Sequence, residues 1–180
     1  MITLFISLLT FVPQDTDFIG WLQKNGQTIA PTYETRNCVE FAYEAYHRYY
    51  GVTLDSKNKS IFFIGNATVA DANKAYKTKT GYEKISGCQA ALVNAGLGKA
   101  IPTKQAQPGD LIQYWFIEGG RVTWGHACIL KEITKDGWIV IGSQPENDND
   151  NDGIYEDSNG GFGYFLIEPN VLTFVVRPNK

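Results

Sequence analysis

The residue best placed for chemistry is Cys38, in the stretch TRNCVEFAYEAYHRYYG. Apolar and small residues recur after it at helical spacing, so we expect a helix that begins at Cys38 and stops at Gly51. A thiol in the first turn of a helix lies near unpaired backbone N–H groups and the positive end of the helix dipole, which together stabilise the thiolate. Cys38 is therefore a candidate nucleophile. The alternative is an apolar residue on the buried face of the helix.

Asn37 directly precedes this helix. It is a natural N-cap, because its side-chain oxygen can accept hydrogen bonds from the first free N–H groups. The backbone N–H of Cys38 would then be available to an oxyanion that forms when the thiol attacks a carbonyl. Asn37 is thus a candidate residue of the oxyanion site.

The chain offers only two histidines as a general base. His47 shares the predicted helix with Cys38, and at about 100° per residue it points to the opposite face, so we exclude it. His126, in WGHACILKE, stands at the start of a predicted strand. There it could accept the thiol proton and return it to a leaving amine, although a structural strand-end histidine is the alternative. Trp124, close by in the chain, is a candidate contact for substrate or oxyanion.

A third polar group usually holds the imidazole in the right tautomer. The next predicted strand, GWIVIGSQ, ends in two polar residues, Ser143 and Gln144. Neighbouring residues of a strand face opposite sides, and the sequence does not fix the register. Gln144 is the first choice for this role and Ser143 the second.

The elements that must position these residues change type along the chain. After the Cys38 helix, the stretches FFIGN, VADANKAY and ISGCQAALVNAGLG indicate further helical pieces. From Pro108 onward, short apolar runs with turn residues between them predict four strands: DLIQYWFI, GHACILKEI, GWIVIGSQ and VLTFVVRP. Helices followed by an antiparallel meander indicate an α+β fold, with the N-terminal helices packed on one side of a C-terminal antiparallel sheet or half-barrel.

Length and composition limit the function classes. A chain of 180 residues with 43% hydrophobic residues fits one domain, which we assign to residues 14–180. Residues 1–13 begin with the apolar run MITLFISLLTFV, which predicts either an export leader or a buried segment. A net charge of -3 with scattered cations argues against nucleic acid as a partner. We expect a monomer that is secreted or located in the periplasm or cell envelope.

Three cysteines cannot all pair. In an exported protein, a Cys88–Cys128 disulfide would leave Cys38 free. Two buried reduced thiols are the alternative.

The order of these pieces resembles the papain-like cell-wall hydrolases, which include the NlpC-type peptidases and the CHAP amidases. The resemblance rests on NCVEF, on QPGDLIQYW and on GHACILKEITKDGWIVIGSQ, and it spans residues 35–144. It implies a papain-like fold, with Cys38 as nucleophile, His126 as base and acid, and Gln144 or Ser143 as the orienting residue. It also implies that Tyr33, upstream of the nucleophile, helps to bind the oxyanion.

This resemblance implies a cysteine peptidase or amidase that hydrolyses amide bonds of bacterial peptidoglycan without a required cofactor. Its partners would be peptidoglycan or a stem peptide and, for an antibacterial effector, an immunity protein. Two other functions stay open: a cysteine acyltransferase or transglutaminase-like enzyme, and a catalytically silent binding module of the same fold.

An acidic segment follows the last candidate site residue. Asp148, Asp150 and Asp152 alternate before Gly153, as in the first half of a calcium-binding loop. A structural calcium ion and a solvated acidic loop are both compatible with this pattern.

Overall fold

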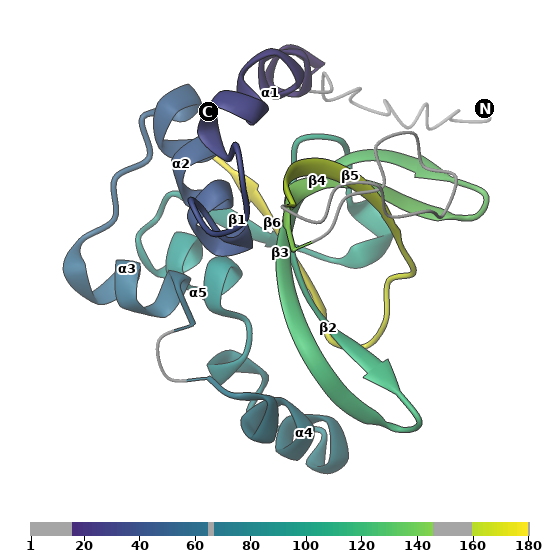
Figure 1. Cartoon of the computed structure of the whole chain (residues 1–180). Helices are drawn as coiled ribbons and strands as arrows, with labels where there is room; N and C mark the ends of the chain where they lie inside the picture. Colours follow the sequence, from purple (N-terminus) through teal and green to yellow (C-terminus); the bar gives the residue numbers. More distant parts are fainter. Residues whose placement is uncertain (1–15, 65–66, 146–159, 180) are drawn as a thin grey trace, which may run out of the picture.

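The computed structural model describes residues 16–64, 67–145 and 160–179. It is an α+β structure in which the α-helices lie on one side of a six-stranded antiparallel sheet (Figure 1). The α-helices are α1 (Thr16–Ile29), α2 (Cys38–Tyr50), α3 (Ser56–Phe62), α4 (Val69–Thr78) and α5 (Gly87–Asn94), with short 3-10 helices η1 (Tyr82–Lys84) and η2 (Thr103–Gln105). The strands are β1 (Gly98–Ile101), β2 (Leu111–Glu118), β3 (Arg121–Thr134), β4 (Gly137–Gln144), β5 (Gly161–Ile167) and β6 (Thr173–Pro178).

The sheet has the strand order β1-β6-β2-β3-β4-β5, and the predicted α+β class is confirmed. The four predicted strands correspond to β2, β3, β4 and β6, whereas β1 and β5 were not predicted. Helix α1 was also missed. The prediction of a helical piece at FFIGN is wrong. Helix α3 ends at Phe62, which is the first residue of that stretch.

Helix α2 begins and ends where the sequence predicts. The Asn37 side-chain oxygen accepts hydrogen bonds from the N–H groups of Val39 and Glu40, at 3.0 and 3.1 Å. The Glu40 carboxylate accepts in return from the Asn37 N–H at 3.0 Å, which completes a capping box. At the other end Gly51 takes a left-handed conformation with φ 69° and closes the helix.

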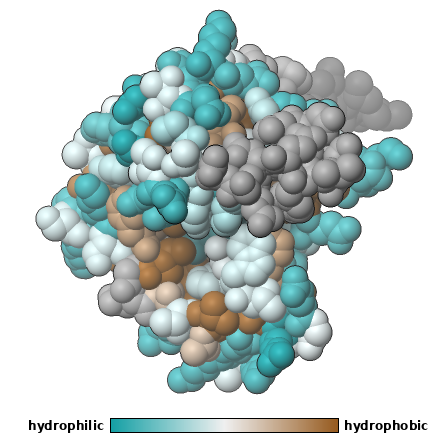
Figure 2. Space-filling view, viewed as in Figure 1, coloured by the Kyte–Doolittle hydropathy of each residue, from teal (hydrophilic) through white to brown (hydrophobic). Residues whose placement is uncertain are grey.

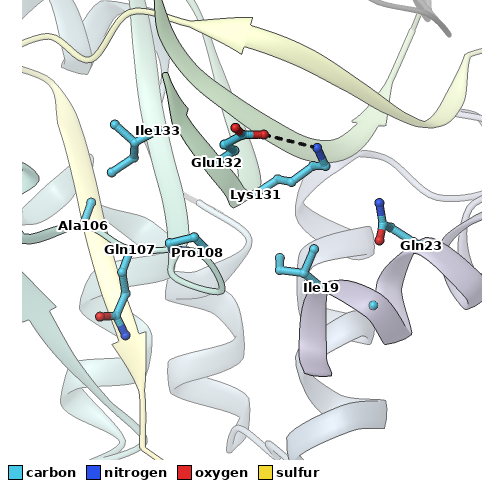
Figure 3. Close-up of a pocket in the computed structure, with 9 residues that line it drawn as sticks. Ile19, Gln23, Ala106, Gln107, Pro108, Lys131, Glu132 and Ile133 are labelled. Atoms are coloured by element: carbon cyan, nitrogen blue, oxygen red, sulfur yellow. Dashed lines mark ion pairs between the residues drawn. The ribbon is translucent and has the colours of Figure 1, made fainter. Parts of the chain in front are cut away.

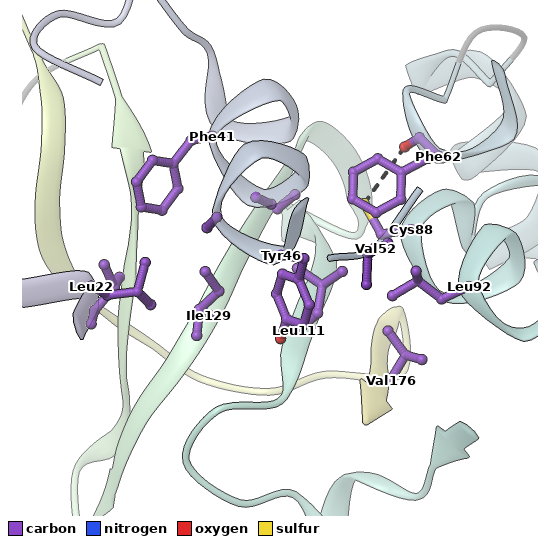
Figure 4. Close-up of a cluster of buried hydrophobic side chains, with 14 of the residues drawn as sticks. Leu22, Phe41, Tyr46, Val52, Phe62, Cys88, Leu92, Leu111, Ile129 and Val176 are labelled. Carbon is purple, nitrogen blue, oxygen red and sulfur yellow. Dashed lines mark hydrogen bonds between the residues drawn. The ribbon is translucent and has the colours of Figure 1, made fainter. Parts of the chain in front are cut away.

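A large apolar core joins the helices to one face of the sheet (Figure 4). Phe41 and Tyr46 of α2 and Leu92 of α5 pack there against sheet residues that include Leu111 and Ile129. We call this side of β2, β3 and β4 the helix face. Its members on those strands include Leu111, Gln113, Ala127, Ile129, Ile141 and Ser143.

The opposite side of the same strands, which we call the far face, carries a second buried cluster. Its members are Ile112, Tyr114, Cys128, Leu130, Trp138, Val140, Ile167 and Val175. The central strands are therefore buried on both faces. Their side chains alternate between two apolar clusters instead of between core and solvent.

The three cysteines are free and buried. Of the two alternatives that the sequence leaves open for Cys88 and Cys128, the structure has the two buried thiols and not the disulfide. The sheet explains why: Cys88 lies in the helix-side core and Cys128 in the far-face cluster. The Cys88 thiol instead donates to the carbonyl of Phe62, at 3.5 Å (Figure 4).

The PGD segment before β2 has a structural role. Asp110 is only 1% exposed and accepts two hydrogen bonds from the Arg177 guanidinium of β6, at 2.8 and 2.9 Å. It also accepts from the Gln107 N–H at 2.9 Å, and Arg177 donates to the Gln105 carbonyl. A bidentate carboxylate–guanidinium pair therefore ties the turn before β2 to the neighbouring strand.

Among the described residues, no helix is both long enough and apolar enough to cross a membrane.

Candidate functional site

Cys38 occupies the first turn of α2 and is 6% exposed. Burial raises the pKa of its thiol above the ordinary value, and hydrogen bonding from the backbone of Ala127, Val39 and Cys38 itself acts in the opposite direction. The expected thiolate is therefore not favoured in this arrangement, because desolvation outweighs the amide donors. The helix start does supply the predicted cluster of N–H groups around the sulfur.

Tyr33 lies beside the thiol. Its side chain hydrogen-bonds with Cys38, and that bond lowers the pKa of the thiol. The pKa of Tyr33 is raised, first by its own partial burial and then by the neighbouring Cys38. Tyr33 sits in a turn closed by the Arg36 N–H, which donates to the Thr32 carbonyl at 3.2 Å. The structure thus brings together two of the residues that the sequence singles out.

Ser143 reaches the same loop from the sheet. It is fully buried on the helix face of β4, and its hydroxyl donates to the Arg36 carbonyl at 2.5 Å. Arg36 is also held through its guanidinium, which donates to the Ile29 carbonyl at 3.0 Å and pairs with Glu44 at 3.2 Å. The peptide that leads into Cys38 is therefore fixed from the sheet, from α1 and from α2.

His126 lies on the far face of β3. Its ring makes edge contacts with the rings of Tyr114, Trp124 and Phe165, at centroid distances of 6.2, 5.7 and 4.9 Å. A side chain at Gly142 would come within 3.2 Å of its Nε2 atom. Nε2 is buried and has no hydrogen-bond partner among the described residues. Burial lowers the pKa of His126 from 6.5 to about 3, so the ring is neutral at physiological pH.

The predicted Cys38–His126 pair is therefore not assembled in this arrangement. Consecutive residues of a strand point to opposite faces, and the residue of β3 that meets Cys38 is Ala127. Gln144 lies on the same side as His126, and its amide donates over a long 3.5 Å distance to the Tyr164 carbonyl. The candidates thus separate into a helix-face group, Cys38 with Tyr33 and Ser143, and a far-face group, His126 with Gln144.

The two remaining candidates have different surroundings. The Asn37 side-chain oxygen is engaged in the capping box of α2, so its contribution to an oxyanion site would come through the helix start that it holds. Trp124 is 41% exposed and stacks on Phe116, with ring centroids 3.5 Å apart and an interplanar angle of 19°. It belongs with His126, away from Cys38. His47 is exposed on α2, in agreement with its exclusion.

The described residues contain no group of three or more His, Cys, Asp or Glu that could hold a metal ion. The predicted calcium ligands Asp148, Asp150 and Asp152 lie outside the described residues.

Two surface hollows lie away from these groups. One, of about 450 Å³, is lined by α1, by strand β3 and by the turn that precedes β2. The Lys131–Glu132 ion pair of β3 forms part of its wall (Figure 3). Another, of about 440 Å³, has the apolar residues Ile61, Ile64, Ala67 and Ala90 in its lining. Hydrophobic surface gathers on the helical side of the molecule, toward α4 and α5 (Figure 2). None of the predicted site residues lines either hollow.

Comparison of the chain with family models, with curated proteins and with solved structures finds no match.

Proposed function

We propose that the protein is a cysteine-dependent amide hydrolase with Cys38 as its nucleophile and the peptide part of bacterial peptidoglycan as its substrate. The observation that carries the proposal is the surroundings of the Cys38 sulfur. Amide donors at the start of α2, the backbone of Ala127 and the Tyr33 hydroxyl converge on one thiol. Such donors can stabilise a thiolate and the oxyanion that follows its attack.

In this proposal the Cys38 sulfur attacks the amide carbonyl, and the C–N bond breaks with release of an amine. The group that hydrogen-bonds the thiol is Tyr33, so proton transfer passes through its hydroxyl. In the resting site the Tyr33 hydroxyl donates to the sulfur; as the sulfur attacks, the hydroxyl turns, its proton passes to the leaving nitrogen and its oxygen takes up the thiol proton. Water then hydrolyses the thioester and regenerates the thiol. The geometry thus supports Tyr33 in the role that the sequence assigns to His126.

The biological setting is part of the same proposal. A wall hydrolase acts outside the cytoplasm, so the proposal includes export of the protein to the envelope or the medium. An immunity protein would accompany it where the protein acts as an antibacterial effector.

Digestion of purified peptidoglycan, with mass analysis of the released fragments, tests this function. Wild type should release stem-peptide fragments, Cys38→Ala should release none, and Tyr33→Phe should be slower by about 10²-fold or more, the usual contribution of a general acid–base group. Folded wild-type protein that releases nothing would overturn the proposal. Loss of release in a folded His126→Phe variant would return proton transfer to His126.

A second candidate is a catalytically silent binding module. Two observations favour it: burial raises the pKa of Cys38, and His126 lies on the far face. A binding module would retain wild-type affinity for peptidoglycan in a Cys38→Ala variant and would release no fragments. Sedimentation of both proteins with insoluble peptidoglycan, measured beside the digestion, separates the two candidates.

A further inference from the structure

We propose that Ser143 is a positioning residue for Cys38, which acts through the Arg36 peptide to hold the thiol against Tyr33. The inference deepens the proposed function and rests on it for its catalytic meaning. It gives Ser143 a role different from the histidine-orienting role that the sequence indicates.

The direction of the Ser143 hydroxyl is the first observation. The side chain is fully buried on the helix face, whereas His126 lies on the far face, so Ser143 does not reach the imidazole. Its proton goes to the Arg36 carbonyl, 107 positions away in the chain, at 2.5 Å. This bond connects the centre of the sheet to the loop in front of Cys38.

The position of that carbonyl is the second observation. It belongs to the peptide between Arg36 and Asn37, and Asn37 is the N-cap whose side chain orders the first turn of α2. Fixing this peptide therefore fixes the direction in which the chain enters the turn that carries Cys38. The amide donors around the sulfur come from the same turn.

The turn that carries Tyr33 is the third observation. The Arg36 N–H donates to the Thr32 carbonyl and closes this turn. The Arg36 carbonyl accepts from Ser143 in the peptide that leads to Cys38, so Arg36 connects the Tyr33 turn to the start of α2. Loss of the Ser143 bond would leave the Arg36 carbonyl free to turn. The Tyr33–Cys38 contact would loosen, although neither residue touches the substituted side chain.

The test is the pH dependence of Cys38 alkylation by iodoacetamide, followed by peptide mass analysis so that Cys88 and Cys128 are scored separately. Ser143→Ala should move the Cys38 profile to higher pH by about half to one unit, the size of one net hydrogen bond. Tyr33→Phe should move it by a similar amount. The double variant should show no further shift, because both changes remove the same contact.

Gln144→Ala is the matched control, since it is the next residue of β4 and lies on the far face. Its profile should coincide with that of wild type, as should the profile of Ser143→Thr, which keeps a hydroxyl. The inference is overturned if Ser143→Ala leaves the profile unchanged, if the shifts of Ser143→Ala and Tyr33→Phe add, or if Gln144→Ala shifts it as much. Alkylation of Cys38 needs no turnover. The experiment therefore tests the role of Ser143 separately from peptidoglycan cleavage.

Discussion

The two faces of the central strands differ in how well their buried polar side chains are hydrogen-bonded. On the helix face, Gln113 is 1% exposed and its amide bonds both the Cys88 N–H and the Ile85 carbonyl, at 2.7 and 3.1 Å. On the far face, His126 is 2% exposed, and its Nε2 atom has no partner among the described residues. Gln144, also on the far face, makes one hydrogen bond to a described residue, over a long 3.5 Å to the Tyr164 carbonyl.

The two buried polar side chains, Gln113 and His126, therefore have different effects on stability. The Gln113 amide caps the start of α5, where the preceding Ser86 makes no side-chain cap, and so helps to fix the helix on the sheet. A satisfied polar group of this kind adds stability and specifies one packing arrangement. An unsatisfied one costs free energy, and the Nε2 atom of His126 has no partner within the described part of the chain. The buried Gln113 amide on the helix face thus helps to hold the fold together. The buried His126 ring on the far face makes no such contribution through Nε2 among the described residues.

The largest expected effect is acid destabilisation through His126. Its pKa is about 3 in the folded protein against 6.5 ordinarily, so above pH 6.5 both states are neutral and the group contributes nothing. Between these values the unfolded state binds the proton first, and stability should fall as the pH is lowered, by on the order of 1 kcal/mol per pH unit. Urea unfolding at a series of pH values should show this slope in wild type.

A His126→Phe variant should show a flatter dependence, because its ring cannot be protonated. His47→Gln, which removes the other, exposed histidine, is the matched control, and the dependence of His126→Phe should be flatter than that of this control. If His126→Phe and wild type were parallel from pH 7 to pH 4, the ring would not be enclosed on the far face, and the comparison between the faces would fail.

Next in size is the removal of a satisfied amide. Gln113→Leu should lower the free energy of unfolding by about 1–3 kcal/mol, because it leaves the buried Cys88 N–H without its acceptor. The Ile85 carbonyl keeps a donor, since the Trp115 indole N–H also bonds it at 2.9 Å. Denaturant unfolding measures the loss. A change within about 0.3 kcal/mol of wild type would show that Gln113 does not fix α5, against the first half of the comparison.

The separation of the faces also explains which features the sequence could predict. The start and end of α2 follow from Asn37, Glu40 and Gly51, whose local chemistry does not depend on the rest of the fold. Helix α1 was missed, and its interior contains Gly20 and Gly26, which weaken a helical pattern. Strands β1 and β5 begin in Gly-containing stretches that resemble turns. These elements depend on tertiary packing, which the local pattern does not contain.

The face of His126 could not be predicted for a related reason. A half-buried strand reveals its faces by alternation, but Ala127, Cys128, Ile129 and Leu130 are all apolar because both sides of β3 are buried. The chemistry-bearing types were visible in the sequence, whereas their directions were not. Cys38 and Tyr33 could be brought together because a short turn joins them. His126 had to be placed by a strand whose pattern specifies no face.

The smallest expected effect is at Gln144. Within the described residues, its amide makes one hydrogen bond, of 3.5 Å, to the Tyr164 carbonyl, so Gln144→Leu should change the free energy of unfolding by no more than about 0.5 kcal/mol. Denaturant unfolding beside Gln113→Leu, the same substitution on the opposite face, gives a matched pair. A loss as large as that of Gln113→Leu would mean that the far face is also held by its polar groups. The expected small loss would leave Gln144 free of a structural role, so that any fall in peptidoglycan cleavage by the folded variant would report on chemistry at the far face.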